Sequence, residues 1–287
     1  MLAGMTNRRR GHSSSTARRP RRAARRAASS PVLGWLARAG LAARGVEYLL
    51  IGIIAIQIAV GSSGRQADQT GAVRLVAATG FGSVVLWLMV IGFAGLMLWR
   101  LSEAIWGTAG RDGKAATKRA AALAKAVIYG AVAFGVLKYA LGLGAPKSSD
   151  KQSQDLTAEI LRWPGGQALV VVVGLALAGG GIYLAWQAWQ KKFAQELRLT
   201  SASARTRKTV LHLGQAGGIA RGVVAVTAGI FLIVAGLDAN PKQAKGVDSA
   251  LRTLAHTPAG PPVLIVVAVG LLMFAAYSCC AARWPAI

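Results

Sequence analysis

The chain has 287 residues, of which 54% are hydrophobic and only 15% are charged. An ordinary soluble domain contains about 25% charged residues, so this composition argues against a soluble globular enzyme. A net charge of +24 would by itself suggest a nucleic-acid-binding protein, but the placement of the apolar residues gives the charge another meaning.

The first 34 residues form an arginine-rich segment that contains no acidic residue. Such a run repels itself and is typical of a disordered tail. Anionic lipid headgroups attract a basic segment beside a membrane by about 1 kcal/mol per residue, and we favour them as its partner. Nucleic acid is the alternative partner, and we do not expect it.

Six apolar stretches follow, each close to the roughly 20 residues that a membrane-spanning helix needs. They cover residues 45–60, 83–99, 120–143, 167–189, 217–237 and 262–282. Only helices and closed barrels satisfy the backbone in lipid, and the short alternating segments of a barrel are absent. The predicted fold class is therefore an all-α integral membrane protein with six transmembrane helices.

The basic residues predict how these spans are oriented. With the N-terminus placed in the cytoplasm, the cytoplasmic segments hold 25 of the 34 Lys and Arg residues, and the outer segments hold 9. The positive-inside rule then puts both termini in the cytoplasm. We expect a multi-pass protein of the plasma membrane, and the heavy use of Ala, Gly and Arg favours a bacterial inner membrane.

The spans repeat as three pairs. The odd spans share a basic residue at one position, in Arg44-Gly45-Val46, Lys125-Ala126-Val127 and Arg221-Gly222-Val223. In the even spans, Gly82, Gly92 and Trp99 match Gly260, Gly270 and Tyr277. The predicted units are the tail 1–34 and the repeats 35–110, 111–205 and 206–287, related by a pseudo-threefold axis.

Each pair of spans encloses an outer connection with a short amphipathic segment, at residues 71–79, 156–163 and 249–257. Asp68, Asp155 and Asp248 precede or open these segments, and acids favour helix starts. The pattern predicts three short helices on the outer face of the membrane, with unstructured loops as the alternative.

Over residues 35–284, the repeated motifs resemble a membrane family catalogued as domain of unknown function 1206. Its members carry Arg-Gly-(Val) at the start of odd helices and two spaced glycines followed by an aromatic residue in even ones. The middle repeat departs from this pattern, with Lys125-Ala126 in its odd span and Ala176 in place of the second glycine. The resemblance implies tandem two-helix repeats and implies no chemistry, because the family carries no assigned activity.

The repeated cations Arg44, Lys125 and Arg221 are the first candidate site. Around a pseudo-threefold axis they would lie at one depth, in the first turns of the odd helices near the cytoplasm. There they could contact an anionic lipid headgroup or an anionic solute. The alternative is snorkelling, in which long basic side chains reach the interface from a helix end.

An intramembrane ion pair is the second candidate. Glu47 lies three residues after Arg44, and Arg100 and Glu103 repeat that spacing, so each pair shares a helix face. A charge at the bilayer centre costs about 2.5–3.5 kcal/mol on insertion scales. We therefore expect Glu47 to pair with Arg44 or Arg100 or to be protonated, and a proton-relay role for Glu47 is the alternative.

The sequence contains no catalytic constellation, no phosphate-binding loop and no metal-ligand spacing, so we expect no enzyme activity, cofactor or metal. The first hypothesis is a non-catalytic scaffold or accessory subunit that packs against membrane-protein partners or lipids. The alternative is a transporter or channel for a small anionic solute. A water-filled cavity lined by Arg44, Lys125 and Arg221 would favour transport, and a closed, dry axis with an exposed Gly/Ala groove would favour the scaffold.

Overall fold

The computed structural model describes residues 31–61, 64, 66–106, 116–144, 147–196, 203–257 and 259–283. Residues 1–30 of the arginine-rich tail lie outside the described residues. The first helix of the described residues, α2 (Pro31–Ala59), includes the last four residues of the predicted tail, which are therefore helical. Proline is favoured at the first position of a helix, because it has no N–H to leave unpaired there.

Within the described residues, six helices are long and apolar enough to cross a membrane, and the predicted six-span fold is confirmed. They are α2 (Pro31–Ala59), α4 (Gly82–Trp106), α5 (Ala116–Ala140), α7 (Gly166–Trp189), α8 (Ala204–Leu237) and α10 (Gly260–Arg283). The described part of the chain contains no strand. The protein is thus an all-helical, multi-pass membrane protein.

The three short helices that connect the spans are present: α3 (Gln69–Ala77), α6 (Ser149–Leu161) and α9 (Val247–Ala255). Asp68 caps α3 by accepting a hydrogen bond from the Gly71 N–H at 3.0 Å, and Asp248 lies in the first turn of α9. The expectation for Asp155 was wrong, because α6 begins earlier, with Ser148 as its cap and Asp150 in its first turn. We call the end of the molecule formed by α3, α6 and α9 the short-helix face.

Several helix ends follow from local conformation. Gly61 and Gly142 adopt positive φ angles of 72° and 71° just after α2 and α5, where a residue with a Cβ would be strained. Gly165, with φ of 78°, immediately precedes α7. The short 3-10 helices η1 (Lys192–Glu196) and η3 (Pro241–Gln243) follow α7 and α8.

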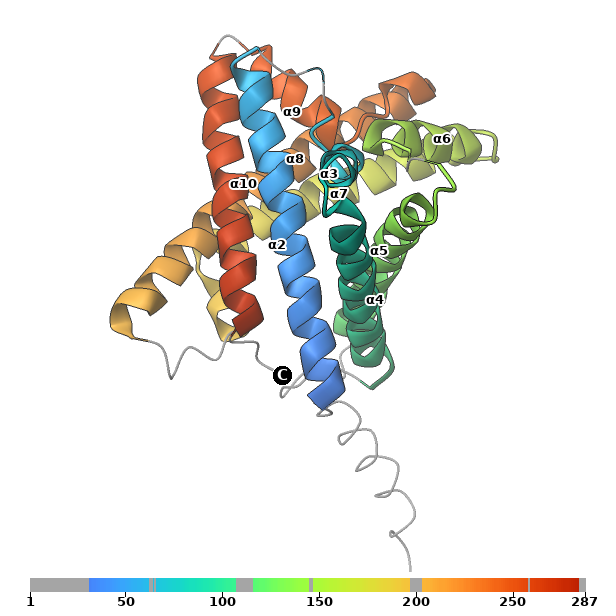
Figure 1. Cartoon of the computed structure of the whole chain (residues 1–287). Helices are drawn as coiled ribbons and strands as arrows, with labels where there is room; N and C mark the ends of the chain where they lie inside the picture. Colours follow the sequence, from blue (N-terminus) through green and yellow to red (C-terminus); the bar gives the residue numbers. More distant parts are fainter. Residues whose placement is uncertain are drawn as a thin grey trace, which may run out of the picture.

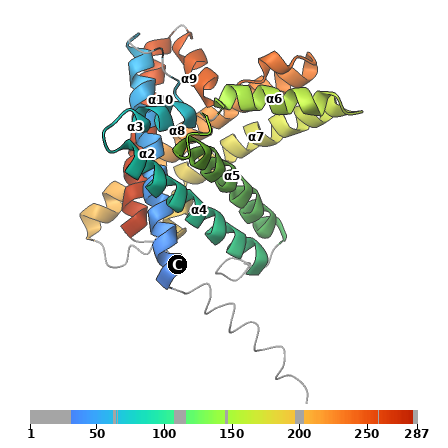
Figure 2. The same ribbon diagram turned by 45° about the vertical axis from the view of Figure 1, so that its right-hand side comes forward.

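The spans pack in the order α5, α4, α2, α10, α8, α7. Figure 1 shows α2 and α10 side by side, with α7 and α8 crossing the molecule diagonally behind them. Contacts between successive repeats (α4 with α5, α7 with α8, α10 with α2) are all present, as a threefold plan requires. Within the second repeat, however, α5 and α7 do not pack along each other, and Figure 2 shows them at a wide angle. The ring of six spans is therefore open between α5 and α7.

The glycines of the even spans lie at close helix contacts in the first and third repeats. A Cβ on Gly92 would lie 2.9 Å from the Ala39 carbonyl oxygen, and one on Gly270 would lie 2.5 Å from the Cβ of Ala220. These glycines therefore let α4 approach α2 and α10 approach α8, as small residues do in membrane helices. In the second repeat, Ala176 occupies the corresponding position and is exposed.

The buried side chains form two clusters. One joins α2, α8, α9 and α10, with Ile54, Leu251 and Leu264 fully buried, and the other joins α4 to α5 around Phe93 and Val136. Both clusters include α2 or residues packed on it, so α2 connects the two halves of the molecule. The space beside the first cluster holds the candidate site.

Candidate functional site

A cavity of about 400 Å³ lies between α2, α7, α8 and α10 and reaches the starts of the short helices. Its charged side chains are Glu47, Asp68, Arg221 and Lys245. Most of the remaining wall is aliphatic, including Ile51, Leu177, Leu184, Val224, Leu232 and Leu271. A mainly apolar pocket with a few converging polar groups is the usual form of a small-molecule site.

Arg221 is held in the wall of this cavity by aromatic residues of two other helices. Its Nε donates a hydrogen bond to the Tyr48 hydroxyl at 3.0 Å. Its guanidinium carbon lies 4.3 Å from the ring centroid of Phe274 and 5.3 Å from that of Tyr48. Cation–π contacts of this kind offset part of the cost of removing an arginine from water.

Arg44, at the equivalent position of the first repeat, meets the same two rings. Its guanidinium carbon lies 4.5 Å from the centroid of Phe274 and 5.9 Å from that of Tyr48. The rings themselves pack edge to face, with centroids 4.8 Å apart. The structure thus brings two of the three repeated cations together around one aromatic pair, although Arg44 does not line the cavity.

Lys125 lies apart from the other two cations. It is exposed on α5, and it does not line the cavity. The helix that carries it, α5, packs against α4 at the open end of the row of spans. The placement of these cations in first helical turns was also wrong, since α2, α5 and α8 begin well before them. Arg44 and Arg221 lie near the middle of their helices.

Glu47 is half-buried and faces the cavity. Its carboxylate makes no hydrogen bond within the described chain, and no ion pair with Arg44, Arg100 or Arg221 within 4.0 Å. Arg44 and Arg221 are nevertheless the cations whose charge acts on it most strongly. The pair expected for Glu47 is therefore not formed in this structure.

The second half of the expected ion-pair set is formed on α4. Arg100 Nη1 lies 2.7 Å from Glu103 Oε2, and both side chains are mostly shielded from solvent. The Arg100 guanidinium also lies over the ring of Trp99, 4.4 Å from its centroid. These residues are not part of the cavity wall.

Three acids at the starts of the short helices link the three repeats in a cycle. We call Asp68, Asp150 and Asp248 the carboxylate clasp. Each accepts a backbone N–H at or just before the start of the next repeat's short helix: Asp68 from Ser149 at 2.7 Å, Asp150 from Gly246 at 2.6 Å, and Asp248 from Ala67 at 2.7 Å. Charge-assisted bonds to backbone N–H groups at helix starts are among the stronger hydrogen bonds in proteins. Because Asp68, Ser149 and Gly246 also line the cavity, the clasp forms its wall at the short-helix face.

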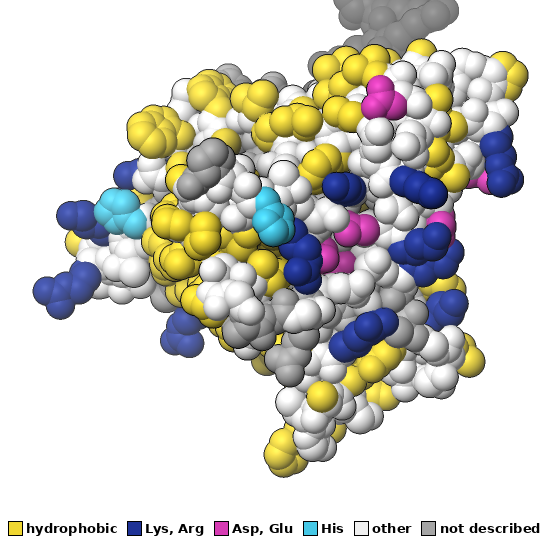
Figure 3. All heavy atoms as spheres, turned by 90° about the horizontal axis from the view of Figure 1, so that it is seen from above, with side chains coloured by type: hydrophobic (Ala, Val, Ile, Leu, Met, Phe, Trp, Pro, Cys, Tyr) yellow, Lys and Arg dark blue, Asp and Glu magenta, His cyan; other side chains and the backbone are white. Residues whose placement is uncertain are grey.

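Asp155, predicted in place of Asp150, has a different role. It pairs with Lys147 Nζ at 2.5 Å and with Lys151 Nζ at 3.3 Å on the exposed side of α6. Hydrogen bonds from these two ammonium groups hold the pKa of the Asp155 carboxyl below its usual range. Figure 3 looks onto the short-helix face and shows acidic and basic side chains intermingled there.

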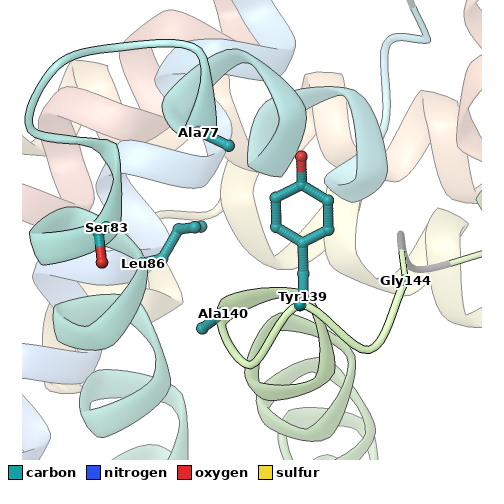
Figure 4. Close-up of a pocket in the computed structure, with 7 residues that line it drawn as sticks. Ala77, Ser83, Leu86, Tyr139, Ala140 and Gly144 are labelled. Carbon is teal, nitrogen blue, oxygen red and sulfur yellow. The ribbon is translucent and has the colours of Figure 1, made fainter.

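A second pocket, also of about 400 Å³, lies between the end of α3, α4 and the end of α5. Figure 4 shows Tyr139 pointing away from α5 toward the level of Ala77. Tyr139 is its one ionisable lining residue among those described. Within the described residues, no group of three or more His, Cys, Asp or Glu side chains could hold a metal ion.

Comparison with known proteins agrees with this architecture. The family described as Domain of Unknown Function (DUF1206) matches the chain three times, over residues 39–107, 120–191 and 216–285. The chain is also 28% identical over 252 residues to "Uncharacterized protein YxxB" of Bacillus subtilis (strain 168), covering 87% of this chain and 90% of that protein. No solved structure matches the chain significantly. With three matches that together span most of its length, the chain belongs to the Domain of Unknown Function (DUF1206) family.

Proposed function

We propose that this protein carries a small charged solute across the membrane through the cavity between α2, α7, α8 and α10. The observation that supports this is the presence of Glu47 and Arg221 in one cavity wall, within the spans and without an ion pair between them. Each charge at membrane depth costs about 2.5–3.5 kcal/mol on insertion scales, so ionisable residues there commonly mark substrate pathways.

The threefold hypothesis expected an anion pathway lined by all three repeated cations, and this cavity is lined differently. Of the repeated cations, Arg221 alone lines it, and an acid lies in the same wall. The solute therefore does not need to be an anion, since both signs of charge are available to it. The roles of Glu47 and Arg221 are binding roles, and no step of chemical catalysis is part of this proposal.

Counterflow in proteoliposomes tests the proposal. Vesicles are loaded with one of four unlabelled probes, L-leucine, 4-methylpentanoate, 3-methylbutylamine or inorganic phosphate, and uptake of the same labelled probe is followed. We expect the wild type to accelerate uptake of at least one probe and Glu47→Gln to abolish that acceleration. Uptake equal to that of empty liposomes for all four probes, with the protein folded, would contradict transport of solutes of these classes.

A scaffold or accessory subunit is the second candidate, and the opening between α5 and α7 favours it. On α7, Gly179 and Gly180 face open space, so a neighbouring helix could approach closely there. Native purification followed by mass spectrometry tests this role, with Gly180→Leu as the variant that should release a bound subunit. An identical set of co-purifying proteins for both would argue against docking at this position.

A further inference from the structure

We propose that the cavity binds a zwitterion with a primary ammonium group, whose anionic group contacts Arg221 and whose ammonium contacts Glu47. This inference rests on the proposed function for the position of the site, and it adds the chemical class of the ligand. The supporting observation is that hydrogen-bonding groups of Arg221 and Glu47 have no partner within the described chain.

The guanidinium of Arg221 has donors to spare. Of its five N–H groups, the one on Nε donates to Tyr48, and its terminal nitrogens make no hydrogen bond within the described chain. The Phe274 ring lies against the guanidinium, and the hydrogen bond to Tyr48 orients it. A guanidinium oriented in this way is suited to a carboxylate or a phosphate, which it can bind with two parallel hydrogen bonds.

The carboxylate of Glu47, in contrast, needs hydrogen-bond donors. It faces the same cavity and accepts no hydrogen bond from the described chain. It is also separated from Arg221 by more than the 4.0 Å of an ion pair, so the two charges do not satisfy each other directly. A primary ammonium group, with three N–H donors, supplies what this carboxylate lacks.

The other charged groups of the wall are one acid, Asp68, and one cation, Lys245. Asp68 uses both carboxylate oxygens on backbone N–H groups, those of Gly71 and Ser149. The Lys245 ammonium lies 5.2 Å from the ring centroid of Phe231. The wall thus holds two acids and two cations, and a ligand without net charge matches it. The aliphatic wall, with Leu177 and Leu184, suits an apolar substituent on that ligand.

Two sources present this chemistry. An aliphatic amino acid carries its ammonium and carboxylate on one carbon, and a phosphatidylethanolamine headgroup joins its ammonium to a phosphate by a two-carbon link. A lipid could enter from the side, since the ring of spans is open between α5 and α7. The experiment has one arm for each source.

The first arm measures binding by calorimetry in phosphatidylcholine nanodiscs. The probes are L-leucine, 4-methylpentanoate (leucine without its ammonium) and 3-methylbutylamine (leucine without its carboxylate). A hydrogen bond to a charged group contributes about 1.5–3 kcal/mol, so L-leucine should bind roughly ten- to hundredfold more tightly than either fragment. Glu47→Gln should remove the preference over 4-methylpentanoate, and Arg221→Gln the preference over 3-methylbutylamine.

Matched variants separate this selectivity from a loss of fold. Lys125→Gln removes the equivalent cation of the second repeat, and Glu159→Gln removes an exposed acid; neither residue lines the cavity. Both should bind L-leucine as the wild type does. A change of preference between two fragments, with one fragment still bound, cannot arise from an unfolded protein.

The second arm incubates the protein with equal amounts of phosphatidylethanolamine and phosphatidylglycerol and measures retained lipid by native mass spectrometry. Retention of phosphatidylethanolamine that is lost in both Glu47→Gln and Arg221→Gln identifies the lipid as the source. If neither arm shows a preference for the zwitterion, or if the preference persists in both variants, the inference is wrong. Selective binding without counterflow would overturn the transport proposal and leave this one intact.

Discussion

Tyr48 is a residue of the first repeat that holds an arginine of the third. Its hydroxyl accepts a hydrogen bond from Arg221, and its ring also lies near the Arg44 guanidinium. A double-mutant cycle on the stability of the purified protein should therefore separate the two arginines. Tyr48→Phe and Arg221→Gln should couple by about 1.5–3 kcal/mol, because the first change removes the acceptor of a charged donor.

The same cycle with Arg44→Gln is the control. Arg44 contacts the Tyr48 ring and makes no hydrogen bond to its hydroxyl, so Tyr48→Phe leaves that contact in place. Near-additive effects are expected for Tyr48 and Arg44. Additive effects for Tyr48 and Arg221 as well would mean that the hydrogen bond contributes nothing to stability in detergent.

At this scale, the sequence predicted part of the site. The repeat alignment identified Arg44 and Arg221 as equivalent, and they do meet the same rings. Phe274 could not be predicted, because it comes from α10 and belongs to no repeated motif. The pairing of Glu47 was wrong for a related reason. The spacing of residues on a helix face shows which side chains can meet, and here Arg44 turns to the aromatic rings instead.

Among the helices, α7 and α8 approach each other through glycines spaced seven residues apart, Gly174 and Gly181 on α7 and Gly222 and Gly229 on α8. A Cβ on Gly181 would lie 2.8 Å from the Gly222 carbonyl oxygen, which is backbone and cannot move aside. Gly181→Ala should therefore destabilise the protein by about 1–3 kcal/mol, the usual cost of overpacking. Thermal unfolding in detergent measures the change.

Gly180→Ala is the matched control, one residue away on the same helix. Nothing lies within 4 Å of the position that its Cβ would take, so the protein should keep its stability or gain slightly from the better helix former. Equal losses from both variants would show that flexibility, and not close packing, explains these glycines. The sequence shows the three consecutive glycines 179–181, but only the position of α8 distinguishes Gly181 from its neighbour.

The carboxylate clasp gives a second prediction for the helices. Asp150 accepts hydrogen bonds from the Gly246 N–H and, at 2.6 Å, from the Ser249 hydroxyl. Asp150→Ala leaves these donors at the start of α9 without their partner, at a cost of about 1–3 kcal/mol. Hydrogen exchange in α9 should increase. Asp238→Ala, an exposed acid outside the clasp, should leave α9 unchanged; if both variants behave alike, the clasp does not hold α9 in place.

For the whole molecule, the sequence predicted six spans in three pairs. It could not predict whether these six spans form a closed ring. Its one indication was the divergence of the middle repeat, where Ala176 replaces a glycine. In the structure, the two spans of this repeat do not pack together. Of these two spans, α7 contributes Leu177 and Leu184 to the cavity wall, whereas α5 contributes no lining residue.

An even number of spans places both ends of the chain on one side of the membrane, opposite the short-helix face. Which side that is follows from charge, and 25 of the 34 Lys and Arg residues belong to segments on the side of the termini. Since basic segments are retained in the cytoplasm during insertion, we propose that the termini are cytoplasmic and the clasp faces outward.

Single cysteines in a Cys279→Ser, Cys280→Ser background test this orientation in intact cells with a membrane-impermeant maleimide. Lys151→Cys on α6 and Thr253→Cys on α9, both at exposed positions, should be labelled without permeabilisation. Ser203→Cys, at the start of α8, should be labelled only after it. The inverse labelling pattern would mean that the orientation is opposite and that the termini lie outside. The carboxylate clasp, which forms one wall of the cavity that contains Glu47 and Arg221, would then face the cytoplasm. A solute would meet that wall from the cytoplasmic side.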